Sequence, residues 1–115
     1  MKYEMKLQND PFNKIKDGSK TIELRLNDEK RRLLKVSDTI LFTNLSTLEK
    51  MEVIIKNLYY FNSFEELYKS FSKEEMGYNK EDKASYKDML EYYSIEEEKK
   101  CGVVGIKIKK LWKKS

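Results

Sequence analysis

Histidine is absent from this sequence of 115 residues, and cysteine occurs only once, at Cys101. These two absences exclude an internal disulfide, a Ser–His–Asp triad, a Cys–His dyad and a histidine-ligated zinc site. Apolar runs such as Ile54–Ile55 are much shorter than the ~20 residues that span a bilayer. Residues 1–10 also lack the apolar stretch of a signal peptide. We therefore expect a cytoplasmic protein that has no membrane partner and uses no cofactor and no metal ion.

Charged residues are plentiful, at 38% of the chain, but they are unevenly distributed. Residues 1–58 carry a net charge of +3, residues 59–100 carry −4 and residues 101–115 carry +5. This division indicates that the basic ends and the acidic middle form different surfaces. The alternative is that the lysines serve only to keep the chain solvated.

Alternation of apolar and polar residues predicts β-strands at residues 2–7, at 20–26 and within the final segment 102–112. Residues 39–44 and about 49–58 are rich in Thr, Ile, Val and Phe, which predicts two more strands. These two are joined by one short connection, which favours an antiparallel pair.

Two of these strands are expected to place their apolar faces in the core of a single barrel. The residues expected to be buried together are Ile22, Leu24, Leu26, Val104, Ile106 and Ile108. Lys107 and Lys109 then point outward. A slip of one residue would bury lysine and glutamate instead, so the alternation specifies the register strongly.

Short helices are expected between the strands. Asp10–Pro11 predicts a helix start and Gly18 predicts its end, while residues 31–34 form a short turn. A longer helix is expected at about 80–93. Capping-box patterns that should each begin a short helix start at Ser63, Ser72 and Ser94.

The order of these elements predicts the fold class. We expect an α+β protein, built as a small, mostly antiparallel β-barrel decorated by short helices. A chain of this length suits one domain, over residues 1–115, with a helical insertion at about 61–100.

The stretch GSKTIELRLND at residues 18–28 combines charge with a strand pattern. Alternation places Thr21, Glu23 and Arg25 on one face, with Lys20 at the entrance of the strand. Together these side chains offer a cation, an acceptor and a planar fork that grips a phosphate or a base edge. The alternative is a solvent-facing strand with one ion pair, worth less than about 1 kcal/mol.

The longer run PFNKIKDGSKTIELRLND resembles the signature of ASCH domains, which belong to the PUA-like superfamily. Gly18, Lys20, Glu23 and Arg25 fill its motif, Gly-x-Lys-x-x-Glu-x-Arg. VSDTILF and CGVVGIKI are similar to the family's turn and closing strand, although Ser37 replaces the usual glycine of that turn. The resemblance implies a PUA-like β-barrel with a cleft beside the motif that binds RNA or a nucleotide-like small molecule. The ligand-binding residues are then Lys20, Thr21, Glu23 and Arg25.

The resemblance leaves the question of catalysis open. Some small ASCH proteins are amidohydrolases of acetylated cytidine, and their nucleophile is a threonine three residues after the motif lysine. Here Glu23 holds that position, and Thr21 lies only one residue from Lys20. Other ASCH proteins are reported as ribonucleases. The alternative to a binding protein is therefore a small hydrolase, either a ribonuclease or an amidohydrolase of a modified nucleoside, that uses Lys20 and Glu23.

Further candidates lie outside the motif. The basic ends are expected to form one nucleic-acid surface that includes Arg31, Arg32, Lys107 and Lys109. The aromatic runs 59–61 and 92–93 could offer a platform on which bases stack. Cys101 follows two lysines that could lower the pKa of an exposed thiol, but a lone cysteine at a strand start is more typical of packing.

Overall fold

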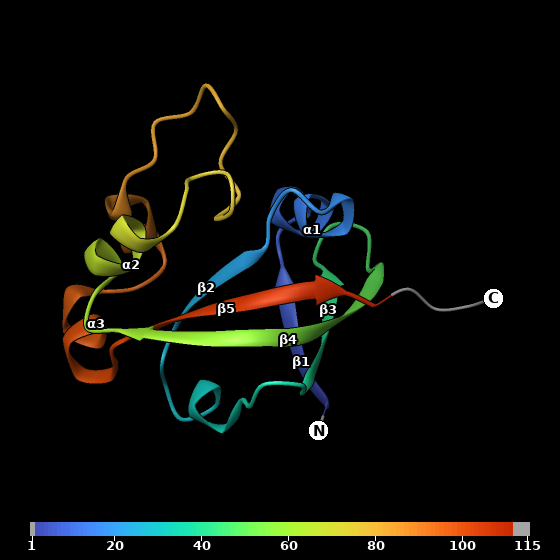
Figure 1. The fold of residues 1–115 in the computed structure, drawn as a ribbon, viewed down its shortest axis with the longest axis horizontal. Coiled ribbons are helices and arrows are strands. Elements are labelled where there is room, and N and C mark those ends of the chain that lie inside the picture. Colours follow the sequence, from blue (N-terminus) through green and yellow to red (C-terminus); the bar gives the residue numbers. More distant parts are fainter. Residues whose placement is uncertain (1, 112–115) are drawn as a thin grey trace.

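A five-stranded sheet, curled into a half-barrel, organises the fold (Figure 1). The computed structural model describes residues 2–111. In chain order the elements are β1 (Lys2–Leu7), α1 (Asn9–Asp17), β2 (Ile22–Leu26), η1 (Arg31–Leu33), β3 (Thr39–Asn44), β4 (Lys50–Phe61), α2 (Phe64–Ser70), η2 (Tyr86–Glu91), α3 (Ile95–Cys101) and β5 (Val103–Lys110). The labels η1 and η2 denote short 3-10 helices.

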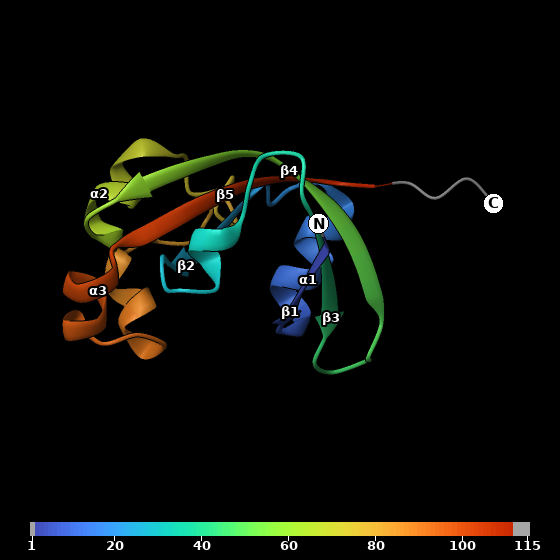
Figure 2. The ribbon, with the colours of Figure 1, turned by 90° about the horizontal axis from the view of Figure 1, so that it is seen from below.

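The strand order β1-β3-β4-β5-β2 leaves β1 and β2 at the two edges of the sheet. β1 pairs in parallel with β3, and the other neighbours pair antiparallel, including β3 with β4 as predicted. α1 lies inside the curve of the sheet beside β1, while α2 and α3 gather at the opposite end (Figure 2). The predicted α+β class with a mostly antiparallel sheet is confirmed.

The predicted register of the two apolar faces is confirmed, because all six expected core residues are buried and Lys107 and Lys109 are exposed. The six buried residues do not share one core, however, and this corrects the prediction that they are buried together. One set packs inside the half-barrel with α1, and comprises Val104, Ile106 and Ile108. The other set packs against α2, and comprises Ile22, Leu24 and Leu26.

The pairing of β2 with β5 explains why the core is divided. Glu23 lies opposite Ile106 and Arg25 lies opposite Val104, so these charged residues share the inner face of the half-barrel. The apolar face of β2 is turned the other way, where the segment between β4 and β5 covers it. Because both faces of β2 are covered, alternation alone did not distinguish the inside of the barrel from its outside.

Two of the three predicted caps begin helices. The side chains of Ser63 and Ser94 each accept a hydrogen bond from the backbone amide three residues later, at the starts of α2 and α3. Ser72 instead caps a turn that ends at Gly77. The carbonyl of Glu75 in this turn accepts from two backbone amides at the entrance of β2, so it serves the sheet and not a helix.

The helix expected at about 80–93 is replaced by irregular chain and η2, so that prediction was wrong. Lys73 Nζ donates to the backbone carbonyls of Lys80 at 2.7 Å and Asp82 at 2.6 Å. In a helix these carbonyls would accept from amides of the following turn. Tertiary contacts therefore override the local helical tendency.

Candidate functional site

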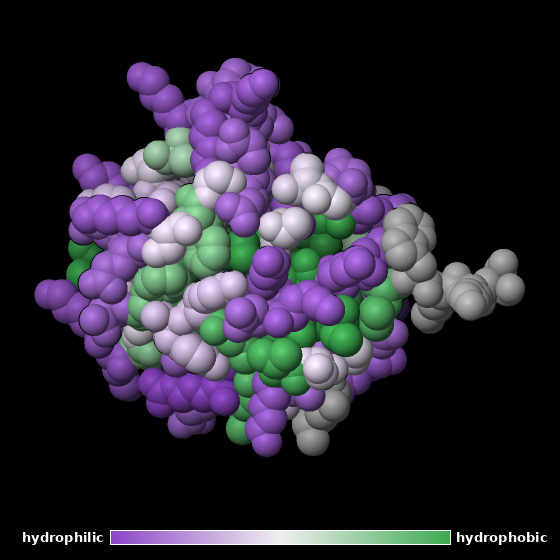
Figure 3. Space-filling model, in the orientation of Figure 1, coloured by the Kyte–Doolittle hydropathy of each residue, from purple (hydrophilic) through white to green (hydrophobic). Residues whose placement is uncertain are grey.

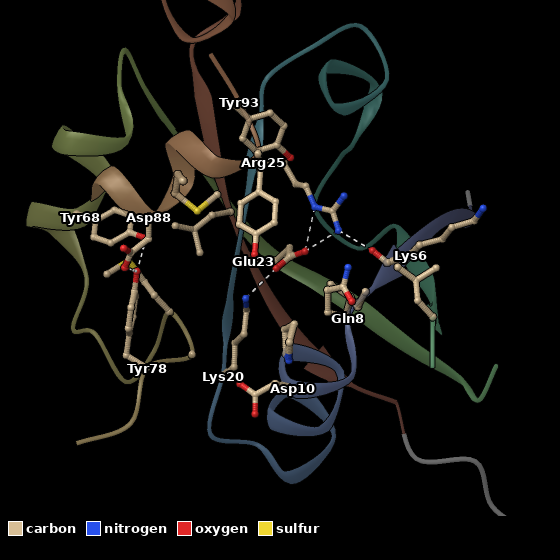
Figure 4. A pocket seen from close by; sticks show the side chains of 18 residues that line it. Lys6, Gln8, Asp10, Lys20, Glu23, Arg25, Tyr68, Tyr78, Asp88 and Tyr93 are labelled. Carbon is tan, nitrogen blue, oxygen red and sulfur yellow. Dashed lines mark hydrogen bonds and ion pairs between the residues drawn. The ribbon is translucent and has the colours of Figure 1, made fainter. Parts of the chain in front are cut away.

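A cleft of about 540 Å³ lies between the two edge strands, where the half-barrel stays open. Its walls come from the end of β1, the start of α1, β2, Leu45 after β3, and the segment from α2 to Tyr93. Lys20, Glu23 and Arg25 all line this motif cleft (Figure 4). The structure thus brings together the three charged residues that the sequence singled out.

Glu23 lies at the centre of a buried charge network. Its Oε1 contacts Lys20 Nζ at 3.0 Å, and its Oε2 accepts from Arg25 Nε at 2.9 Å and from Nη2 at 2.8 Å. Glu23 is only 4% exposed and Lys20 only 8%. The alternative of a solvent-facing ion pair is therefore wrong, because the inward register carries the carboxylate away from water.

The electrostatics of the network fix the charge of Glu23. Burial alone would raise the pKa of its carboxyl, but the charges and hydrogen bonds of Lys20 and Arg25 outweigh that effect and lower the pKa to about 2. Burial also opposes the charge of Arg25, but the Glu23 carboxylate raises the pKa of the guanidinium. The two cations Lys20 and Arg25 thus share one carboxylate, and the network of three side chains has a net charge of +1.

Arg25 also connects the two edge strands, which do not pair with each other. Its Nη2 donates to the backbone carbonyl of Lys6 in β1 at 3.0 Å. This bond satisfies an acceptor on an open sheet edge and holds the guanidinium across the gap. No acceptor within residues 2–111 bonds to Nη1, so Arg25 keeps a donor for a ligand.

Lys20 reaches Glu23 because the strand begins only at Ile22. Strict alternation from position 20 would place the two side chains on opposite faces. Instead the backbone amide of Lys20 donates to the carbonyl of Lys14 at 3.0 Å, ahead of the strand. Gly77, with φ of 103°, lies against the lysine side chain, and a Cβ atom there would stand 2.9 Å from Lys20 Cδ. A side chain at position 77 would displace Lys20.

Tyrosines from the segment between β4 and β5 line another wall of the cleft (Figure 4). They are Tyr68, Tyr78, Tyr92 and Tyr93. The Tyr78 hydroxyl donates to Asp88 Oδ2 at 2.7 Å and lies 2.8 Å from the Tyr68 hydroxyl, which is then the donor to Tyr78. Burial and these hydrogen bonds raise the pKa of Tyr78, so it stays protonated at neutral pH.

Sequence reasoning found this wall only in part. Tyr92 and Tyr93 were named as stacking candidates, whereas Tyr78 and Asp88 were missed, because only the tertiary fold brings them together. The other aromatic run is not in the motif cleft. Tyr59 packs edge-on against Phe71, with ring centroids 5.1 Å apart, and Phe61 packs on the same ring.

The sequence matches the ASCH domain over residues 5–111. The chain belongs to the ASCH domain family. The crystal structure of hypothetical protein PH0355 is 35% identical and has a TM-score of 0.82, covering 96% of this chain and 100% of that one. The solution NMR structure of a Pyrococcus furiosus protein is 36% identical with a TM-score of 0.72, covering 98% of this chain and 100% of that one.

A more distant solved structure shows the fold alone. It is the crystal structure of an ASCH domain from Lactobacillus crispatus, which is 15% identical with a TM-score of 0.62. The match covers 95% of this chain and 79% of that one. The half-barrel is thus the fold of an ASCH domain. No curated protein matches the chain.

Thr21 lies apart from the motif cleft of this ASCH domain. Thr21 lines a second pocket and not the cleft that holds Glu23 and Arg25. The Thr21 amide donates to the carbonyl of Glu75 at 2.9 Å, and its own carbonyl accepts from Ile108 at 2.9 Å. Thr21 therefore does not join Glu23 and Arg25 in the motif cleft, although the sequence placed it with them.

The four residues predicted for a nucleic-acid surface are divided between two places. Lys107 and Lys109 lie in the second half of β5 and line the second pocket. Arg31 and Arg32 belong to η1, where Arg31 Nη1 donates to Asp28 Oδ2 at 3.3 Å. A single surface that includes all four stays a prediction.

Within residues 2–111, no group of three or more His, Cys, Asp or Glu side chains is arranged to hold a metal ion. No helix in the same span is long and apolar enough to cross a membrane. Cys101 is partly buried at the end of α3, which suits the packing role considered for it.

Proposed function

We propose that this ASCH domain binds RNA or a nucleotide-like ligand in the motif cleft, without forming a covalent bond to it. The observation that carries the proposal is the buried network in which Lys20 and Arg25 share the Glu23 carboxylate. The network leaves a positive charge and unused N–H groups at the wall of a cleft large enough for a nucleotide. An anionic or strongly polar group is the partner that such a wall favours.

The tyrosine wall supports the choice of a nucleotide over a simple anion. Tyr92 and Tyr93 line the same cleft as the charged network, and base stacking on aromatic rings tolerates any base. Tyr93 is itself stacked on Phe64, with ring centroids 5.7 Å apart, so its plane is held in place. The ligand is therefore expected to combine a flat ring with a negatively charged or polar group.

The state of Glu23 argues against the alternative of a hydrolase that uses it as a base. A general base is most effective with a pKa near the working pH, whereas the pKa of Glu23 is about 2. Both of its oxygens already accept from Lys20 and Arg25, and no proton acceptor of comparable burial lies beside it in the cleft among the described residues. Glu23 is better suited to orienting two cations.

The test is a titration with nucleosides, nucleotides and short RNAs, monitored by amide NMR. We expect saturable shifts at Glu23 and Arg25, and a loss of affinity of at least tenfold in Arg25→Gln. Lys83→Gln removes an exposed positive charge from outside the cleft and serves as the matched control. The proposal fails if the panel leaves the amides of the cleft unmoved, or if Arg25→Gln binds as well as the control.

A further inference from the structure

A second groove, of about 590 Å³, lies beside the motif cleft. It is formed by the end of α1, the entrance of β2, β4 and the second half of β5. Six lysines line it, and Asp17 is its one carboxylate among the described residues. The lysines of this groove are Lys16, Lys20, Lys56, Lys107, Lys109 and Lys110. In Figure 3, hydrophilic side chains cross the face over β4 and β5, among apolar patches.

Within residues 2–111, three of these lysines lack a partner for their charge. No carboxylate among the described residues forms an ion pair with Lys56, Lys107 or Lys109. By contrast, Lys16 is paired with Glu49, and Lys20 with Glu23. The groove therefore concentrates uncompensated positive charge on one face, which attracts a polyanion.

The one carboxylate among the described residues of the groove offsets only a part of the lysine charge. Asp17 Oδ1 accepts from both the side chain and the backbone amide of Ser19, and these hydrogen bonds lower the pKa of the Asp17 carboxyl. Asp17 therefore stays ionised and sets one negative charge against six lysines. The base of the groove is apolar at Ile15 and Ile108, so the lysine side chains can lie along it with their ammonium groups in water.

Position also links the groove to the motif cleft, because Lys20 lines both of them. Its Nζ contacts Glu23 in the cleft, while the neighbouring residue Thr21 lines the groove. An RNA strand that places one nucleotide in the motif cleft would therefore have a basic surface beside its next nucleotides. Gly18 adds to this access, since nothing lies within 4 Å of the position of a Cβ atom there.

We propose that the groove binds the phosphodiester backbone of single-stranded RNA, through Lys56, Lys107 and Lys109, next to the nucleotide held in the motif cleft. This inference rests on the proposed function for its ligand class. It differs from the single basic surface predicted from the sequence, because Lys56 joins the two lysines of β5 while Arg31 and Arg32 do not line the groove.

The experiment measures the affinity of hexauridylate and hexaadenylate between 50 and 200 mM salt. Each phosphate contact to a single strand contributes about −0.7 to the slope of log affinity against log salt. Three contacts give a slope of about −2, which is a loss of roughly 20-fold over that range. The triple variant Lys56→Gln, Lys107→Gln, Lys109→Gln should lose most of this slope.

The matched control removes the same charge elsewhere. Lys69, Lys83 and Lys87 are exposed, line neither cleft nor groove, and form no ion pair among the described residues. Their triple substitution by Gln should keep the wild-type slope. Equal salt slopes in the two triple variants would overturn the proposal that the groove binds RNA. So would displacement of the RNA by polyglutamate of equal charge, because a surface that recognises only charge does not read a phosphodiester.

The cleft and the groove fail in different ways. Uridine and adenosine monophosphates are too short to fill both, so the groove variant should bind them as the wild type does. If the monophosphates bind and the hexamers gain nothing from the groove lysines, the groove is refuted and the proposed function stands. If neither the monophosphates nor the hexamers shift the amides of the cleft, the proposed function fails and the proposal of a shared RNA strand fails with it.

Discussion

Replacement of Glu23 by glutamine tests the central network most directly. The change keeps the size of the side chain and one of its two accepting oxygens, but it replaces the other oxygen with an NH2 donor and removes the charge that Lys20 and Arg25 share. The pKa of Glu23 falls from 4.5 to about 2, which corresponds to roughly 3 kcal/mol at about 1.4 kcal/mol per pKa unit. Breaking a buried ion pair costs a similar amount, about 3–5 kcal/mol. We expect Glu23→Gln to lower the free energy of unfolding at pH 7 by about 3 kcal/mol.

The pH dependence follows from the direction of this shift. The pKa of Glu23 in the folded state lies below its value in the unfolded chain, so the unfolded state takes up the proton first as the pH falls. The stabilisation is therefore fully present above about pH 5 and is lost as the pH falls toward 2. The difference in stability between the wild type and Glu23→Gln should shrink over that window.

Urea denaturation followed by far-ultraviolet circular dichroism, at pH 7 and at pH 3, measures both quantities. The slope m should be the same for the two proteins, so that a shift of the midpoint reports stability. Glu29→Gln is the control, because Glu29 is exposed and has no partner among the described residues. The reasoning is refuted if Glu23→Gln costs no more than Glu29→Gln, or if its cost at pH 3 equals its cost at pH 7.

Four further substitutions test the candidate site. Arg25→Lys should lower ligand affinity roughly 10- to 100-fold, since a point charge cannot replace the fork, and unchanged affinity in a calorimetric titration would contradict this. Gly77→Ala should weaken binding by displacing Lys20, whereas Gly18→Ala, at a similarly positive φ but in open space, should cost about 1–2 kcal/mol of stability and leave affinity intact. Equal affinities of these two variants would show that contact with Lys20 is unimportant. Thr21→Ala should leave affinity and any hydrolysis unchanged, and loss of activity in that variant alone would make the protein a threonine hydrolase.

Local patterns were enough to place most strands and several caps. Alternation identified β1, β2 and β5, the β-branched and aromatic residues identified β3 and β4, and the serine patterns identified the starts of α2 and α3. The alternation and the caps are reliable signals because they depend on neighbours within four residues, where side-chain direction follows directly from backbone geometry. The sequence failed at 80–93, where the carbonyls of Lys80 and Asp82 accept from the side chain of Lys73, which lies outside the segment and beyond one helical turn.

The motif shows the same limit within the candidate site. The sequence by itself determined that Glu23 and Arg25 share a face, that Lys20 lies near them, and that the chain resembles the ASCH family. It did not determine which face of β2 is inside the half-barrel. Both faces of β2 are covered, and alternation shows that two faces differ but not which of them points into the barrel.

Only the tertiary structure decided the remaining features of the site. It turned the charged face of β2 inward, so that two cations must share one buried carboxylate, and it joined Arg25 to the backbone of β1 across the open edge of the sheet. It also brought Tyr78 and Asp88 to the cleft and Lys56 to the lysines of β5. Apart from the ion pairs of Glu23, which are local, these contacts join residues far apart in the chain, and such pairs are set by how the sheet curls and what packs on it. The sequence therefore specified the chemical groups, and the fold specified which of them meet.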